Sequence, residues 1–359
     1  MRILDRYVLR EFLGYLALGM ITFLGIFIVV DVFEKVDTFV DGEAPVALVA
    51  RFYLYYAPWV AVQVLPVAML LASLMALGRL VRQHELTAML MAGMSLARAY
   101  GAVLVFGMLV SIGAFALEQG VVPEANYQRR IILQHDIKKK PRPSSRRERD
   151  VLYVGRGGRI YTIGSYDPER ALMRDVIIEE REQNVVTRRI DAQLGRWIDD
   201  HWELTGVTIR TFDGDRLDEE QRSTLELDVP ERPRDFARVE REPEEMGWRA
   251  LGALIERRRL SGSPVTQQIV DWHMKFAFPL INFIVVLIGA ALSTRIRRGG
   301  MAVGFGLSLL ISFIYYCGLR AGQALGHGGA LPPVVAAWIA NLLFGGVALV
   351  LFLRAQRGR

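Results

Sequence analysis

Histidine and carboxylate residues are the first candidates for chemistry in this sequence, but their spacing argues against a site. The five histidines are scattered, and none belongs to an H-E-x-x-H motif or another spaced ligand set. His84 and Glu85 are adjacent, which places their side chains about 100° apart on a helix. His201 and Glu203 would share one face of a strand, where a solvated pair is the simpler interpretation. The sequence therefore predicts no catalytic residue and no metal site.

Phosphate-binding and nucleophile motifs are also absent. No Gly-Lys pair occurs, which excludes a P-loop, and neither G-x-G-x-x-G nor G-x-S-x-G is present. The basic run that begins at Lys138 has no interleaved aromatic residues, so nucleic acid is not an expected partner. We therefore expect a chain that is not an enzyme and binds no cofactor of its own.

The distribution of hydrophobic residues predicts the secondary-structure elements on which the charged residues lie. Of the 359 residues, 52% are hydrophobic, and they concentrate in two blocks on either side of a charged middle third. A membrane-spanning helix needs about 20 mostly apolar residues. Six stretches meet this requirement, and they predict an α-helical membrane protein with six transmembrane helices: 12–30, 54–78, 100–117, about 276–293, 301–319 and 331–353.

Arginine placement predicts the orientation. The two ends of the chain and two of the connections are rich in arginine, whereas the alternate connections hold only Lys35, Arg51 and Arg320. Short cytoplasmic segments carry the excess of Lys and Arg. Both termini are therefore expected in the cytoplasm of an inner membrane, with the long insert on the periplasmic side. The arginines that carry this argument are Arg2, Arg6, Arg10, Arg79, Arg82, Arg98, Arg295, Arg297, Arg298, Arg354, Arg357 and Arg359.

The insert, 118–265, separates the helices of 1–117 from those of 266–359. From Val151 onward, short β-branched or aromatic runs alternate with Gly and Asp turns. This pattern predicts an all-β periplasmic domain: an antiparallel sandwich, a jelly roll or a related curved sheet. The segment 240–259 has apolar residues at helical spacing and is interpreted as an amphipathic connector. Because Cys317 is the single cysteine, no disulfide within the chain supports the domain.

The connection at about 83–93 predicts a short amphipathic helix on the cytoplasmic surface. Glu85, Ala88, Met89 and Ala92 share one helical face, and Gly93 is a natural stop signal. Such a helix either docks a partner or lies in the lipid headgroups.

Cationic residues gather at the outer ends of the expected spans. The spans themselves are nearly free of ionisable residues, which argues against an ion-coupled transporter. Lys35, Arg129, Arg130 and Arg320 would suit an amphiphile with an anionic head, and ordinary interfacial anchoring is the alternative.

The sequence resembles the LptF/LptG (YjgP/YjgQ) permeases of lipopolysaccharide export. The resemblance begins at Leu65-Pro66 and continues through Leu77-Gly78-Arg79, His84-Glu85-Leu86 and Ala92-Gly93-Met94. Leu4-Asp5-Arg6-Tyr7, Val40-Asp41-Gly42, Tyr315-Tyr316 and Leu331-Pro332-Pro333 fit as well. The resemblance covers the whole chain, including the arrangement of three spans, an insert and three more spans.

The resemblance implies a permease subunit of an ABC transporter that takes lipopolysaccharide from the inner membrane to a periplasmic bridge. Its partners would be a cytoplasmic ATPase dimer that binds ATP, a second permease subunit, and a bridge protein of similar jelly-roll fold. Glu85, Leu86 and Met89 would couple to the ATPase, and spans one and five would form lateral gates. Arg130 matches a basic position that faces lipid phosphates, and Lys35, Arg129 and Arg320 are the other candidate lipid contacts. Some members have a basic residue where Asp31 stands here.

Two other functions fit the residues. One is a permease subunit of a different lipid or lipoprotein ABC exporter. The other is a non-transporting membrane anchor or sensor with a periplasmic β-domain. Copurification with a nucleotide-hydrolysing subunit would separate both permeases from the anchor, and the identity of bound lipid would separate the two permeases.

Overall fold

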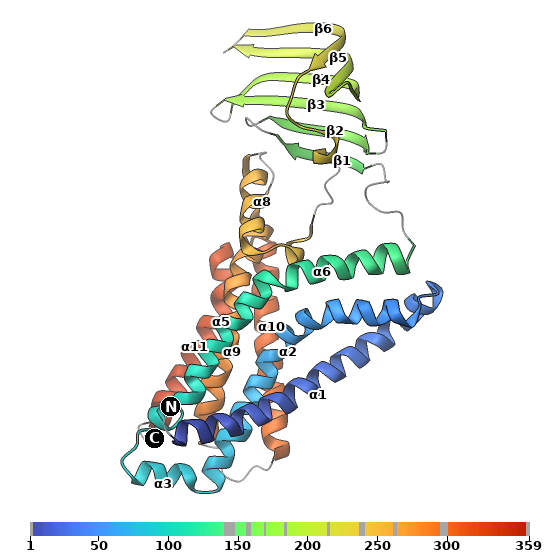
Figure 1. Cartoon of the computed structure of the whole chain (residues 1–359). Helices are drawn as coiled ribbons and strands as arrows, with labels where there is room; N and C mark the ends of the chain where they lie inside the picture. The colour runs from blue at the N-terminus through green and yellow to red at the C-terminus, as the bar shows by residue number, and fades with distance from the viewer. Residues whose placement is uncertain are drawn as a thin grey trace. The chain divides into compact units, whose positions relative to one another are not determined.

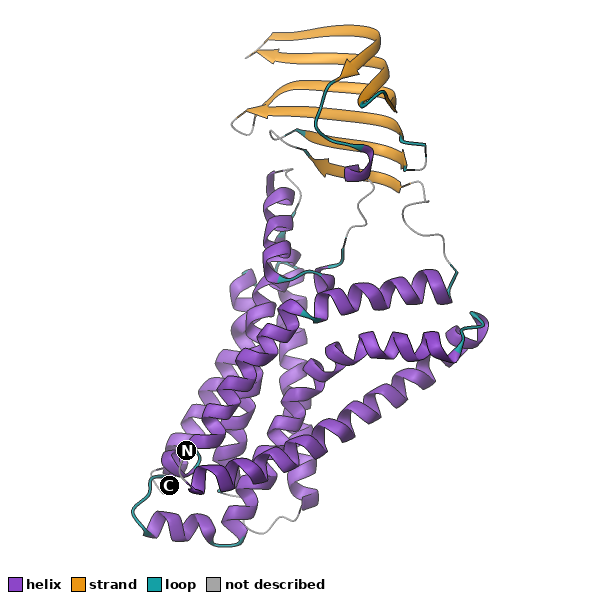
Figure 2. Cartoon of the chain, viewed as in Figure 1, coloured by secondary structure: helices purple, strands orange, loops and turns teal. Residues whose placement is uncertain are grey.

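The computed structural model describes residues 3–139, 148–155, 159–168, 170–182, 185–213, 216–236, 241–260, 264–294 and 301–356. It divides into a helical unit and a sheet unit (Figure 2). The helical unit comprises Met1–Leu133, Glu242–Gly252 and Val265–Arg359, and the sheet unit comprises Gln134–Arg241 and Ala253–Pro264. The sheet unit thus lies within the expected insert, 118–265, whose bounds stay a prediction. Arg2, Arg295, Arg297, Arg298, Arg357 and Arg359 of the orientation argument lie outside the described residues, as do residues 140–147 of the basic run.

Six helices of the described chain are long and apolar enough to cross a membrane, which confirms the predicted number of spans. They are α1 (Ile3–Asp41), α2 (Val46–Arg82), α5 (Gly101–Gly120), α9 (Thr266–Ser293), α10 (Met301–His327) and α11 (Pro333–Gln356). Shorter elements connect them: α3 (Glu85–Met91), α4 (Leu96–Ala99), α6 (Val122–Ile131), a 3₁₀ turn, η4 (Pro243–Glu245), and α8 (Trp248–Leu260), the expected connector.

The first two helices are longer than a membrane requires. α1 has 39 residues and α2 has 37, so each is more than about 55 Å long at the usual helical rise. The hydrocarbon core of a bilayer is about 30 Å thick. Hydropathy located only the apolar part of each helix, because the added turns carry polar residues such as Asp31 and Lys35. α2 contains Pro58 and Pro66 and is bent along its length (Figure 1), as expected where proline removes backbone hydrogen bonds.

Helices α2 and α9 form the centre of the helical unit. Their apolar windows are 72% and 67% buried, compared with 11% for α1. The two helices approach closely at Gly289, where a Cβ atom would lie 1.8 Å from the Ser73 hydroxyl oxygen. Small residues allow such close approach between membrane helices. The largely exposed faces of α1, α5, α10 and α11 are apolar, as expected for surfaces covered by lipid or by another membrane protein.

The sheet unit contains one six-stranded antiparallel sheet in the order β1-β2-β3-β4-β5-β6. This confirms the all-β prediction. Every described pairing joins strands that are consecutive in the sequence, which is a meander, whereas a jelly roll in the strict sense contains Greek-key connections. The strands are β1 (Glu148–Val154), β2 (Ile160–Asp167), β3 (Leu172–Glu182), β4 (Val185–Ile198), β5 (His201–Asp213) and β6 (Arg216–Leu227).

One face of the sheet is apolar and is covered by the segment that follows β6. Val229 and Phe236 of this segment belong to the buried cluster of the sheet unit. The Phe236 ring lies 5.3 Å from the Tyr161 ring and 5.7 Å from the Trp202 ring, centroid to centroid. Between these two anchors, the buried Glu231 carboxylate accepts a 3.1 Å hydrogen bond from the Tyr161 hydroxyl. The covering segment, 228–236, therefore completes the core of the sheet unit.

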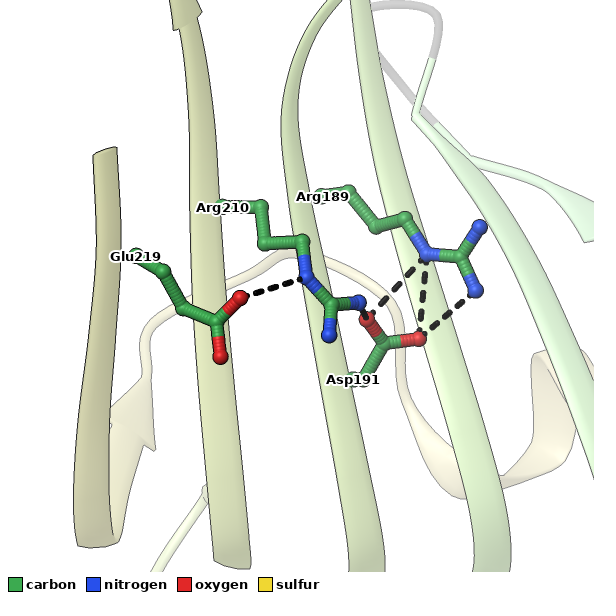
Figure 3. A network of polar contacts seen from close by, with 4 residues as sticks. All are labelled: Arg189, Asp191, Arg210 and Glu219. Carbon is green, nitrogen blue, oxygen red and sulfur yellow. Dashed lines mark hydrogen bonds and ion pairs between the residues drawn. The ribbon is translucent and has the colours of Figure 1, made fainter. Parts of the chain in front are cut away.

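The opposite face carries a ladder of ion pairs across β4, β5 and β6 (Figure 3). Asp191 bonds Arg189 at 2.9 Å and Arg210 at 2.7 Å, and Arg210 also bonds Glu219 at 3.1 Å. Side chains alternate across a strand, so the neighbouring Ile190 points into the core and is buried. The hydrogen bond with Asp191 raises the pKa of Arg189. Opposite charges on facing strands stabilise this register.

Candidate functional site

The predicted surface helix is present as α3, within the expected 83–93. Leu86 is buried, and Met89 packs against the same apolar core of the helical unit. Tyr7 of α1 donates a 3.1 Å hydrogen bond to Glu85 Oε1. These three predicted coupling residues thus fasten α3 to the helical unit, whereas its exposed side presents Ala88 and Met91.

Two ion pairs attach the α3 connection to the start of α1. Arg79 lies 2.6 Å from Glu11, and Arg98 lies 3.2 Å from Asp5. Figure 1 shows both chain ends beside α3. Arg79 and Arg98 therefore lie with the start of α1 at one end of the helical unit.

Lys35 is paired within the chain in the C-terminal part of α1. Its ammonium group forms an ion pair with Asp31, one turn earlier. Tyr53 of α2 donates a 3.0 Å hydrogen bond to the other oxygen of Asp31, whose side chain is buried. Asp31 therefore fixes the position of the nearest cation.

Arg129 of α6 lies over two aromatic rings of α2. Its guanidinium carbon is 4.3 Å from the Tyr56 ring centroid and 5.9 Å from that of Trp59. Planar guanidinium groups stack favourably on aromatic faces.

Arg130, the next residue, has a different environment. Its Nε atom lies 2.5 Å from Glu245 Oε1 and its Nη2 atom lies 2.7 Å from Glu245 Oε2. The pair is bidentate, and the Glu245 side chain is only 3% exposed. Arg130 therefore connects α6 to η4 within the helical unit, so the structure gives it a clear role in the fold.

An apolar cavity of about 590 Å³ lies between α1, α2 and α10. Spans one and five, the expected gates, are α1 and α10. The charged residues of its wall are Asp31, Glu34 and Arg320. Arg320 donates a 2.9 Å hydrogen bond to Gln323, one turn later on α10. The apolar wall includes Phe23, Ile26, Phe27, Val30, Val64, Val67 and Leu309.

A second cavity of about 380 Å³, here called the polar chamber, adjoins the apolar cavity. The two share Trp59, Gln63, Tyr316 and Arg320 as wall residues. The chamber is lined by residues of α2, α5, α6, η4, α9 and α10, and several are ionisable: Glu118, Glu242, Glu244, Asp271, Lys275, Arg320 and His327.

The polar chamber corrects one sequence inference. Glu118 lies near the C-terminal end of α5 and Lys275 lies in the N-terminal part of α9, so the spanning helices do contain ionisable residues. The predicted third span ended at Leu117 and the predicted fourth span began at about Phe276. Each boundary therefore excluded the charged residue next to it. A hydropathy boundary falls at the first charge, whereas the helix and its buried contacts continue. The sequence did contain a signal for these two residues: one charged side chain stands directly next to each of the two predicted boundaries.

Within the part of the chain that the structure describes, no group of His, Cys, Asp and Glu is arranged to hold a metal ion. The arrangement is an apolar cavity beside a polar one, with the short helix α3 at the other end of the bundle. Such a site can hold an amphiphile.

A search of curated proteins finds no match to this chain. One family model matches nearly its whole length, residues 6–354. The match spans the six helices and the sheet unit together, and it agrees with the resemblance carried by the sequence motifs. The chain therefore belongs to the LptF/LptG family of lipopolysaccharide export system permeases.

Proposed function

We propose that this chain extracts lipopolysaccharide from the inner membrane as one permease subunit of an ABC transporter and passes it to a periplasmic bridge. The observation that carries the proposal is the apolar cavity between α1 and α10, with Arg320 in its wall and the Lys35–Asp31 pair beside it. Acyl chains are accommodated by the apolar wall. Arginine binds phosphate oxygens through a planar fork, so Arg320 and Arg129 are the strongest candidate contacts for lipid phosphates.

ATP hydrolysis belongs to a separate cytoplasmic ATPase dimer in this proposal. The contact surface is α3, whose exposed side presents Ala88 and Met91. The hydrogen bond from Tyr7 holds the Glu85 carboxylate at the root of the helix. A movement of α3 imposed by the ATPase would therefore be transmitted to α1, which lines the apolar cavity.

A second permease subunit of the same family would face the apolar surfaces of α1 and α10. Ile21 of α1 is 73% exposed and Phe313 of α10 is 67% exposed. A bridge protein of similar fold would extend the sheet. In the described order β1 and β6 lie at the two edges, and edge strands accept an added strand through main-chain hydrogen bonds.

Filling the apolar cavity tests this function. Val67→Trp on α2 adds a large ring to its wall, and the assembled complex should copurify with less lipopolysaccharide than wild type. Val105→Trp on the exposed face of α5 is the matched control and should retain normal lipid. Mass spectrometry of the bound lipid provides the measurement. A wild-type complex that carries no lipopolysaccharide, or a Val67→Trp complex that carries the normal amount, would contradict the proposal.

A further inference from the structure

The C-terminal end of α10 is joined to α9 through one carboxylate. His327 Nε2 lies 2.8 Å from Asp271 Oδ1, and the Gln323 side-chain amide donates a 2.8 Å hydrogen bond to the same oxygen. A carboxylate accepts hydrogen bonds, so the ring nitrogen that faces Asp271 is the donor. One oxygen of α9 therefore holds two side chains of α10.

The other contacts of this helix end are apolar and close. A Cβ atom at Gly326 would lie 2.5 Å from the Ala336 Cβ atom of α11 and 2.8 Å from a methyl carbon of Val270 of α9. A Cβ atom at Gly322 would lie 2.5 Å from the Ala336 carbonyl oxygen. Small residues allow such close approach, but a glycine has no side chain that can form a hydrogen bond. The bonds to Asp271 therefore supply the polar attachment of this helix end to α9.

The same carboxylate positions Arg320 through Gln323. The nitrogen of the Gln323 amide is bonded to Asp271, and its oxygen accepts a 2.9 Å hydrogen bond from Arg320 Nη1. A side-chain amide carries its donor and its acceptor on different atoms, so the bond to Asp271 decides which atom is presented to Arg320. Arg320 is a wall residue of both cavities. Asp271 therefore acts on a candidate lipid contact through Gln323.

His327 and Asp271 are accessible to protons. Their side chains are 31% and 21% exposed, and both line the polar chamber. Histidine is the side chain that ordinarily changes its charge between about pH 5 and pH 8. A neutral ring gives Asp271 a hydrogen bond, whereas a protonated ring gives it an ion pair as well. Protonation therefore strengthens the attachment of α10 to α9.

Other charged groups face this pair from the chamber wall. Among the described residues, the wall residues of α2 and α6 carry no charge, and neither does the beginning of α11, on which this end of α10 packs. The charged wall residues of α5, η4 with its cap, α9 and α10 are Glu118, Glu242, Glu244, Lys275 and Arg320. Of these, Glu118 and Lys275 interact with each other. All five are retained in the variants below, so a difference between variants reports His327.

We propose that Asp271 and His327 form a pH-sensitive latch between α9 and α10. At acid pH the ion pair holds the end of α10 against α9 and, through Gln323, holds Arg320 in the wall that the two cavities share. At alkaline pH this end of α10 separates more easily. The predicted orientation places it on the periplasmic side, so the latch responds to the pH of that compartment. The latch stands on the geometry, and its consequence for lipid rests on the proposed function.

The test measures the separation of α9 and α10 as a function of pH. Spin labels are attached at the exposed positions Gln267→Cys of α9 and Leu325→Cys of α10, after Cys317→Ser removes the single native cysteine. Double electron–electron resonance is recorded on the full-length chain in phosphatidylcholine nanodiscs without lipopolysaccharide. We expect the ratio of separated to joined molecules to rise about fivefold between about pH 5.5 and about pH 8, as the ion pair is lost.

Two variants of His327 separate its charge from its hydrogen bond. His327→Gln retains a donor without a charge, so its ratio should stay near the alkaline value at every pH. His327→Lys retains a charge throughout the range, so its ratio should stay near the acid value. His273→Gln is the matched control, because His273 is a partly exposed histidine of α9 outside the chamber wall. Its profile should follow that of wild type.

Three results would overturn the inference: a wild-type ratio that does not change with pH, a His327→Gln profile that matches wild type, or loss of the profile in His273→Gln. The experiment contains no lipopolysaccharide, so its result is independent of export. A pH-dependent separation in a protein that copurifies with no lipopolysaccharide would refute the export function and leave the latch standing.

Discussion

Arg130 offers a direct test of which outer cations serve the fold and which serve the lipid. The Arg130→Met substitution removes the guanidinium group and leaves the Glu245 carboxylate nearly buried. The Glu242 backbone N–H, 3.2 Å from Oε2, still donates to it. Breaking a buried ion pair by removing one partner costs about 3–5 kcal/mol. Because the Arg130 side chain is 18% exposed, we expect the lower end, about 3 kcal/mol.

The assay is a double-mutant cycle on the purified complex. Arg130→Met and Glu245→Gln should each lower the thermal stability of the helical unit, and the two together should cost less than their sum. The exchanged pair, Arg130→Glu with Glu245→Arg, should recover part of the stability. Lipid bound per assembled complex should stay near the wild-type value in Arg130→Met. A variant that melts like wild type but has lost its lipid would refute this reasoning and return Arg130 to the phosphate-binding group.

Three further predictions concern the coupling helix, the orientation and the sheet unit. Glu85→Lys should weaken ATPase association or uncouple hydrolysis from transport while membrane insertion stays normal, because it reverses a charge at the root of α3; wild-type transport by this variant would exclude Glu85 from coupling. Tags after residue 359 and within 79–82 should be accessible only from the cytoplasm, and tags at 213–214 only from the periplasm; labelling of 213–214 from the cytoplasm would invert the topology. Burial and the Glu231 carboxylate raise the pKa of Tyr161 above its ordinary value of 10.0, so the stability this phenol contributes is complete below that pH and is lost as pH rises above it. Tyr161→Phe should therefore flatten the alkaline loss of stability followed by tryptophan fluorescence, and an unchanged profile would contradict the assignment.

The sequence alone determined the architecture. Each of the three signals depends on a local property of the chain. The six apolar runs reflect the free energy of transfer into lipid, and the arginine asymmetry reflects charge at the membrane surface. The strand-like alternation reflects the side-chain period of an extended backbone. Local properties are readable without the fold. For the same reason the α3 segment was predicted within two residues of its bounds, since its shared face and its Gly93 stop are both contained in one short stretch.

Only the tertiary structure decided which partners the charged residues have. Arg129 and Arg130 are neighbours in sequence, yet one stacks on α2 and the other pairs with Glu245, 115 residues away. Similarly, Glu118 and Lys275 looked like span boundaries and instead line one chamber. A hydropathy scale reflects only the unfavourable free energy of transferring a charged side chain into lipid. In the folded protein, the free energy of a buried charge also depends on the group that it is paired with. That partner comes from another helix, so the packing of α2, α6, α9 and η4 had to be known before these residues could be assigned.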